Sequence, residues 1–239
     1  MSGHSKWSTI KRKKGAIDAE RGKVFAKLAK EIYVAAKNGD ADPNNNAALR
    51  MVVEKAKAEN MPKSNIQNAI DKAKNKGSGE NYEQVRYEGY GPSGMAIMID
   101  CLTDNKNRTA SFVRSALTKR GGNLGTDGSV SYLFKRKGMI ILENKYDENE
   151  VMEFVLELDV DDFNVEEDGY VIFTSTEDFL SVKDALEKNG YDSFVMSEVT
   201  YVPDNYMSLD GEVMDKAIAL IEALEDIDDV QNVYHNLDI

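Results

Sequence analysis

The sequence predicts an α+β protein of three domains: a helical N-terminal domain, an α/β domain, and an acidic ferredoxin-like domain inserted into that α/β domain. Apolar residues recur at helical spacing up to residue 75 and in strand-like runs after residue 80. Residues 1–80 hold 17 Lys and Arg against 9 Asp and Glu, residues 81–137 hold 9 against 5, and residues 138–239 hold 4 against 28. The expected domains are 1–78, 79–136 with 204–239, and 137–203.

Three amphipathic helices are expected in the N-terminal domain. In the first, Phe25, Leu28 and Ile32 fall on one apolar face. Asp42-Pro43 offers an N-cap and a first-turn proline for the second helix. The expected helices cover residues 15–37, 42–60 and 62–75, and a flexible linker follows at 76–79.

The next segment alternates strands and helices. Strand-like runs cover 85–90, 95–102 and 129–134, a helix covers 107–120, and a glycine-rich loop covers 121–125. Phe112, Val113, Ala116 and Leu117 are expected to point inward from that helix. The chain ends with a helix at 212–225 and a strand at 230–235. Because a lone helix and strand make no domain, we expect this tail to return to the sheet of residues 81–135.

Between these parts the sequence carries a complete βαββαβ unit. The expected strands are 139–143, 163–165, 170–174 and 194–202, and the expected helices are 148–158 and 178–189. Asp168-Gly169 suits the turn of the central hairpin. This order is that of the ferredoxin-like split unit.

Several protein classes are disfavoured. No run approaches the roughly 18 apolar residues of a membrane span, and the charged N-terminal segment lacks the apolar core of a signal peptide. The single cysteine, Cys101, lies in an apolar run and is interpreted as a core thiol of a cytoplasmic protein.

Enzyme motifs also fail. Gly89–Gly94 matches G-x-G-x-x-G, but a strand-like run follows it where a dinucleotide site needs a helix. The two histidines, His4 and His235, have no metal-ligand spacing to cysteines or to each other. The carboxylates at 148–162 are interpreted as a solvated acidic surface, which could alternatively dock a basic protein partner. We therefore expect no catalytic residue, metal, cofactor or small-molecule substrate.

The basic residues indicate nucleic-acid binding. Lys23, Lys27, Lys30 and Lys37 form a stripe opposite the apolar face of the first helix, and phosphates attract such a stripe. A basic arm precedes the helix, with Trp7 beside it, which could stack on an unpaired base. The alternatives are a solvated lysine face and, favoured for Trp7 alone, an anchor to the core.

A second basic cluster lies on and after the predicted helix 107–120. Its arginines and lysine could contact phosphate or lie in solvent. The glycines that follow at 121–125 could admit a phosphate to the backbone, but a helix end and a tight turn are favoured.

Several motifs together resemble the YebC/PmpR family. They are Gly3-His4-Ser5-Lys6-Trp7, Arg21-Gly22-Lys23, Met61-Pro62-Lys63, Tyr87–Pro92, Asp104–Thr109 and Gly121–Gly125. The resemblance implies a three-domain fold whose third domain is inserted into the second. Bacterial members are described as transcriptional regulators binding promoter DNA. Relatives, including a mitochondrial translational activator, are associated with the ribosome and with synthesis of proline-rich stretches.

The favoured hypothesis is a DNA-binding transcriptional regulator, with a ribosome-associated translation factor that binds ribosomal RNA as the alternative. No predicted element resembles a helix-turn-helix recognition helix, which keeps the alternative open. The candidate nucleic-acid-binding residues are Lys6, Trp7, Lys11, Arg12, Lys13, Lys14, Arg21, Lys23, Lys27, Lys30, Arg108, Arg114, Lys119 and Arg120.

Overall fold

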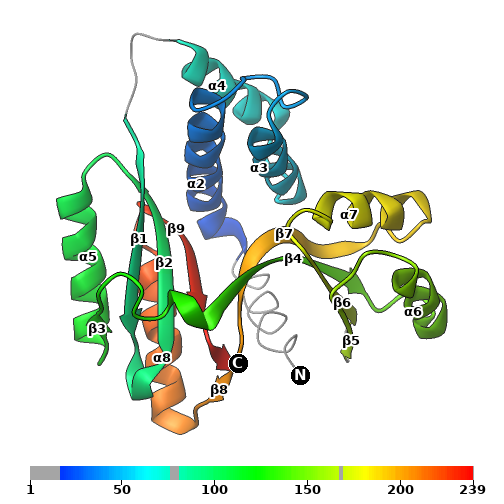
Figure 1. Ribbon diagram of the computed structural model, residues 1–239. Helices are drawn as coiled ribbons and strands as arrows, with labels where there is room; N and C mark the ends of the chain where they lie inside the picture. Colours follow the sequence, from blue (N-terminus) through cyan, green and yellow to red (C-terminus); the bar gives the residue numbers. More distant parts are fainter. Residues whose placement is uncertain (1–16, 76–80, 167–168, 239) are drawn as a thin grey trace. The chain divides into compact units, whose positions relative to one another are not determined.

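The computed structural model describes residues 17–75, 81–166 and 169–238 (Figure 1). These residues divide into two compact units, one of residues 134–204 and one of residues 17–133 with 205–238. Each unit contains both helices and β-sheet, so the predicted α+β, multidomain class is confirmed. The finer three-domain boundaries stay a prediction.

The N-terminal part of the larger unit is helical, as predicted. Helices α2 (Ile17–Lys37), α3 (Ala47–Ala58) and α4 (Lys63–Lys74) pack around one apolar core. Ile32 and Leu49 are fully buried in it. The apolar faces expected from the periodicity are therefore the faces on which these helices meet.

The predicted start of the second helix is wrong, because α3 begins at Ala47. The side chain of Asn46 caps it: Oδ1 accepts from the Leu49 N–H at 3.0 Å, while Nδ2 donates to the Ala35 carbonyl at 2.9 Å. The Asp42 carboxylate instead accepts from the Asn44 N–H at 2.9 Å and closes a turn before the helix.

The rest of the larger unit is a four-stranded sheet in the order β3-β1-β2-β9. Its strands are β1 (Glu83–Tyr90), β2 (Ala96–Thr103), β3 (Asn123–Leu124) and β9 (Val230–His235), and its helices are α5 (Lys106–Lys119) and α8 (Gly211–Glu225). Leu117 of α5 lies against Gly89 and Leu220 of α8 lies against Gly91, so both helices pack on the sheet face on which these two glycines lie.

The C-terminal tail completes this sheet. Strand β9 pairs antiparallel with β2, with Val233 opposite Ile99, which confirms that the tail returns to the sheet of residues 81–135. Strand β8 (Met207–Ser208), before α8, pairs in parallel with strand β10 (Leu237–Asp238), which follows β9. The turn η1 (Pro92–Gly94) joins β1 to β2, so the G-x-G-x-x-G match is a hairpin connection.

The predicted strand at 129–134 is wrong, because Ser131–Leu133 forms the short 3₁₀ turn η2 and the strand starts at Phe134. The backbone N–H groups of Gly128, Val130 and Ser131 donate to the buried carboxylate of Glu88 at 2.7–2.9 Å. The Glu88 carboxylate of β1 thus accepts hydrogen bonds from the backbone N–H groups that a strand at 129–134 would have donated to a neighbouring strand.

The smaller unit has the predicted βαββαβ order. It contains β4 (Phe134–Glu143), α6 (Glu148–Leu156), β5 (Asp162–Glu166), β6 (Gly169–Thr174), α7 (Phe179–Lys188) and β7 (Phe194–Pro203). The strand order is β5-β6-β4-β7 and every pair is antiparallel (Figure 1). This arrangement is the ferredoxin-like split unit.

Candidate nucleic-acid interface

The predicted binding residues fall into three groups. The residues of the basic arm, Lys6, Trp7, Lys11, Arg12, Lys13 and Lys14, lie outside the described residues. The second group is Arg21 with the lysines of α2, where Arg21 is exposed. The third group lies on and directly after α5.

The α2 lysines do not form an open stripe, which differs from the expectation. Lys37 Nζ lies 2.9 Å from Asn81 Oδ1. The ammonium groups of the other three contact residues 225–229, which join α8 to β9 and are called the acidic turn below. Lys23 Nζ lies 2.9 Å from Asp226 Oδ1, Lys27 Nζ lies 2.6 Å from the Glu225 carbonyl oxygen, and Lys30 Nζ lies 2.9 Å from the Asp228 carbonyl oxygen.

The electrostatics of a helix end explain this contact. The last carbonyls of α8 carry the negative end of the helix dipole, and four carboxylates stand in the same five-residue turn. Lysines at positions i, i+4 and i+7 of α2 share one face and can meet these acceptors together. Periodicity shows that the lysines share a face, but it cannot show what lies opposite them.

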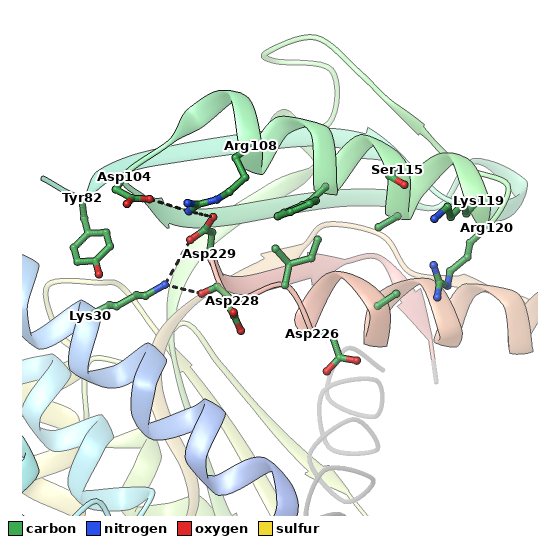
Figure 2. Close-up of a pocket in the computed structure, with 14 residues that line it drawn as sticks. Lys30, Tyr82, Asp104, Arg108, Ser115, Lys119, Arg120, Asp226, Asp228 and Asp229 are labelled. Atoms are coloured by element: carbon green, nitrogen blue, oxygen red, sulfur yellow. Dashed lines mark hydrogen bonds and ion pairs between the residues drawn. The ribbon is translucent and has the colours of Figure 1, made fainter. Parts of the chain in front are cut away.

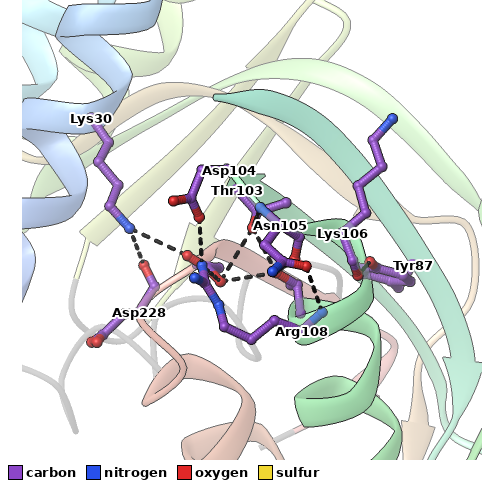
Figure 3. A network of polar contacts seen from close by, with 10 residues as sticks. Lys30, Tyr87, Thr103, Asp104, Asn105, Lys106, Arg108 and Asp228 are labelled. Carbon is purple, nitrogen blue, oxygen red and sulfur yellow. Dashed lines mark hydrogen bonds and ion pairs between the residues drawn. The ribbon is translucent and has the colours of Figure 1, made fainter. Parts of the chain in front are cut away.

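Lys30 and Arg108 point toward the centre of a polar network (Figure 3), and that centre is the buried carboxylate of Asp229. Its side chain is 7% exposed, and Oδ2 accepts from Arg108 Nη2 at 2.7 Å and from Thr109 Oγ1 at 2.9 Å. Lys30 Nζ lies 3.5 Å from Oδ1 of the same carboxylate. Burial alone would raise the pKa of Asp229, but the hydrogen bonds from Arg108 and Thr109 and the charge of Lys30 hold it below its usual range.

Arg108 therefore has a structural role in addition to any binding role. Its guanidinium also lies 2.8 Å from Asp104, one turn earlier in the chain. With two carboxylates beside it, Arg108 has less positive potential to offer a phosphate than an unpaired arginine has.

The remaining cations of α5 are differently placed. Arg114 and Lys119 are exposed, Arg120 is partly exposed, and none of the three forms an ion pair with any residue that the structure describes. The three residues lie in the second half of α5 and directly after it, with Arg114 about 140° around the helix from Lys119, and they are called the basic end of α5 below. Among the predicted residues that the structure describes, these three cations and Arg21 are available to an outside polyanion.

The glycines after α5 end the helix, as favoured from the sequence. Gly121 has φ of 78°, and its N–H donates to the Thr118 carbonyl. The Gly122 N–H donates to the Leu117 carbonyl at 2.9 Å, which completes a Schellman motif. These N–H groups are therefore occupied within the helix end.

An open groove of about 810 Å³ lies between α5 and the end of α8 (Figure 2). Phe112 lines it with 51% of its surface exposed, so the prediction that Phe112 points inward is wrong. The other three predicted residues, Val113, Ala116 and Leu117, are buried.

The groove was missed from the sequence, although a signal was present. At 100° per residue, Arg108, Phe112, Ser115 and Lys119 fall within roughly 60° of one another, next to the inward face. All four line the groove.

No group of three or more His, Cys, Asp or Glu residues in 17–75, 81–166 and 169–238 is placed to hold a metal ion. None of the helices in those ranges is long and apolar enough to cross a membrane. Cys101 is buried, and burial raises the pKa of its thiol to about 12, which confirms a core thiol.

Comparisons with known proteins identify relatives along the whole chain. Residues 5–76 match the family model described as the TACO1/YebC protein N-terminal domain, and residues 82–237 match the TACO1/YebC second and third domain. A probable transcriptional regulatory protein of Geobacillus kaustophilus is 52% identical over 241 residues, covering 100% of this chain and 98% of that protein. The probable transcriptional regulatory protein YrbC of Bacillus subtilis is 53% identical over 239 residues, covering 99% of each.

A solved structure agrees with these relatives. The crystal structure of a conserved hypothetical protein from Aquifex aeolicus superimposes with a TM-score of 0.83 at 44% identity, covering 93% of this chain and 92% of that one. Full-length identity above half, two matched family models and a shared fold lead to one conclusion. The chain belongs to the TACO1/YebC family, whose bacterial relatives are named as regulatory proteins.

Proposed function

We propose that the protein is a cytoplasmic, non-enzymatic regulator that binds nucleic acid and acts as a DNA-binding transcriptional regulator. The names of its relatives support a regulatory role. The observation that carries nucleic-acid binding is the basic end of α5, whose three cations have no acidic partner in the described part of the chain.

Charge makes this surface selective for a polyanion. The net charge of the chain is −12, so a nucleic acid is repelled by much of the protein and attracted where cations are unpaired. Arg114, Lys119 and Arg120 are proposed to contact phosphates, together with Arg21 and the basic arm. The α2 lysines would join them after leaving the acidic turn.

Phosphate contacts imply a steep salt dependence. If 6–10 phosphates are contacted, the affinity should fall by about 10³- to 10⁵-fold between about 50 and 200 mM salt, through loss of counterion release. An affinity that does not change with salt would refute this electrostatic interface.

The decisive experiment is crosslinking in cells, with sequencing of both the bound DNA and the bound RNA. The test variant is Lys119→Glu/Arg120→Glu. The matched control is Lys145→Glu/Lys188→Glu, which makes the same charge change at exposed positions of the smaller unit. Discrete promoter peaks that are lost in the test variant and kept in the control are the expected result.

Two other results would overturn the proposal. Ribosomal RNA crosslinks lost in the test variant, without promoter peaks, would replace transcription with a role in translation. Crosslinks that are equal in wild type, test and control would remove the α5 end from the interface.

A further inference from the structure

We propose that the groove between α5 and α8 binds an unpaired nucleotide within a nucleic-acid strand, with the base stacked on Phe112 and the phosphate beside Lys119 and Arg120. This inference rests on the proposed nucleic-acid binding and specifies the form of nucleic acid that the groove takes. It predicts that single strands and duplexes make different contacts with the protein.

The aromatic platform is the first argument. Phe112 leaves 51% of its surface exposed although its neighbour Val113 is fully buried. Ala116, Ala223 and Ile227 line the same groove and give it an apolar floor. A flat aromatic base that enters the groove would cover this apolar surface, and base–aromatic stacking is tolerant of sequence.

The position of the cations is the second argument. Lys119 and Arg120 line the groove seven and eight residues after Phe112 (Figure 2). That spacing is about 10 Å along a helix axis, and long side chains on a helix lean back toward its N-terminus. Neither cation has an ion pair with a described residue, so both can face the phosphate of a nucleotide whose base lies at Phe112.

The carboxylate of Asp228, at the Lys30 end of the groove, is the third argument (Figure 2). Asp228 is exposed, and Lys30 binds its backbone carbonyl rather than its carboxylate, whereas the Asp226 carboxylate is paired with Lys23. Carboxylates repel phosphate but accept hydrogen bonds from the amino groups of bases. This end therefore favours adenine, cytosine or guanine, which carry amino groups, over thymine or uracil, whose single ring donor is N3–H.

A strand fits better than a free nucleotide. The groove is open, so it cannot enclose a small ligand on all sides. A strand adds phosphate contacts outside the groove, for example at Arg114, which a mononucleotide cannot make. A duplex keeps its bases stacked and paired, so it cannot place one on Phe112 without paying the cost of unstacking.

The test is equilibrium binding of the full-length chain to fluorescent DNA strands of about eight nucleotides and to a duplex, at low salt, by anisotropy. Phe112→Ala should weaken binding of a strand containing only adenine and cytosine by about 5- to 150-fold, the range for loss of one base–aromatic stack. Phe112→Trp should retain that binding. Duplex affinity should stay unchanged in both variants.

Controls separate this inference from the proposed function. Leu156→Ala removes a side chain that is 70% exposed on α6 and should change nothing. Unchanged midpoints of thermal unfolding would show that each variant folds. If wild type binds neither strand nor duplex, the proposed function and the inference both fail.

The remaining outcomes concern the inference alone. Nucleic-acid binding that Phe112→Ala leaves unchanged, or weakens equally for strand and duplex, would overturn it while the proposed function stands. A thymine strand that binds as tightly as the adenine–cytosine strand would overturn base selection by the Asp228 carboxylate. Adenosine monophosphate that competes as well as the strand would overturn the choice of a strand.

Discussion

At the residue scale, Glu88 shows how a single buried charge shapes a loop. Glu88 is 5% exposed, and its carboxylate accepts hydrogen bonds from three backbone N–H groups of residues 128–131. Burial alone would raise the pKa of Glu88, but the N–H groups of Val130, Gly128 and Ser131 hold it below its usual range. The loop therefore depends on the charged form of this side chain.

Glu88→Gln should lower the free energy of unfolding by roughly 2–4 kcal/mol, because an amide of similar shape loses the charge and turns one donor toward backbone donors. Urea denaturation at pH 7 would measure this loss. Glu83→Gln is the control on the same strand, since its exposed ion pair with Lys106 should contribute less than about 1 kcal/mol. Equal losses in the two variants would contradict the structural role of Glu88.

The same carboxylate predicts a pH dependence. Because the pKa of Glu88 is lowered in the folded state, its contribution to stability is fully present above the unfolded value of about 4.3. That contribution is lost as the pH falls through the lower, folded pKa. Urea midpoints measured from pH 6 to pH 3 should therefore fall less steeply for Glu88→Gln than for wild type.

Asp229 and Asp228 offer a matched pair at adjacent positions. Asp229→Asn removes the charge that Arg108 and Thr109 bind and should cost roughly 1–3 kcal/mol of unfolding free energy. Asp228→Asn changes an exposed carboxylate and should stay within about 0.5 kcal/mol of wild type. Chemical denaturation distinguishes the two, and equal effects would remove Asp229 as the centre of the network.

At the scale of the element, α5 is held by a cap at each end. Asn105 caps its start, where Oδ1 accepts from the Arg108 N–H at 3.0 Å. The Schellman motif through Gly121 and Gly122 ends it. Both caps are local, which is why the sequence alone predicts this helix to within about one residue at each end.

Two glycines should respond in opposite directions when changed to alanine. Gly121→Ala should cost about 1–2 kcal/mol, because a side chain is strained at φ of 78°. Gly22→Ala should stabilise by about 0.5–1 kcal/mol, because Gly22 lies within α2 with open space where a Cβ would stand. Thermal unfolding measures both signs. An unchanged or raised midpoint in Gly121→Ala would contradict the cap assignment, and a lowered midpoint in Gly22→Ala would contradict the open helical position of Gly22.

The errors made from the sequence share a physical cause. Helical periodicity predicted most helices, and strand-like apolar runs predicted most strands. The C-terminal helix and strand are too small to form a domain, which predicted that the tail returns to the earlier sheet. The strand expected at 129–134 failed because Glu88, some forty residues away, takes its N–H groups. The prediction that Phe112 points inward is wrong because the periodicity of α5 does not show how much of its apolar face the neighbouring helix covers.

At the scale of the whole molecule, the charge asymmetry of the sequence is partly neutralised inside one unit. Lys23 of α2 and Asp226 of the acidic turn are 203 residues apart in the chain and 2.9 Å apart in the structure. Three lysines of the basic first third thus contact the acidic last third directly. In the proposed function, the acidic turn and a nucleic acid compete for the same lysines.

This competition can be tested with two variants of equal charge. Asp226→Lys removes the carboxylate that Lys23 contacts, whereas Asp215→Lys makes the same change at an exposed position on α8 outside the turn. Both raise the net charge equally, so both should strengthen nucleic-acid binding through the long-range field. Asp226→Lys should strengthen it further, by up to about 5-fold at low salt, because an exposed ion pair contributes at most about 1 kcal/mol.

Anisotropy titrations of the full-length chain measure the difference in affinity between the two variants. The extra gain should disappear together with Lys23 in the double variant Lys23→Gln/Asp226→Lys. Equal affinities of the two single variants would mean that the release of Lys23 from Asp226 does not contribute to binding, and Lys23 would then be removed from the proposed interface.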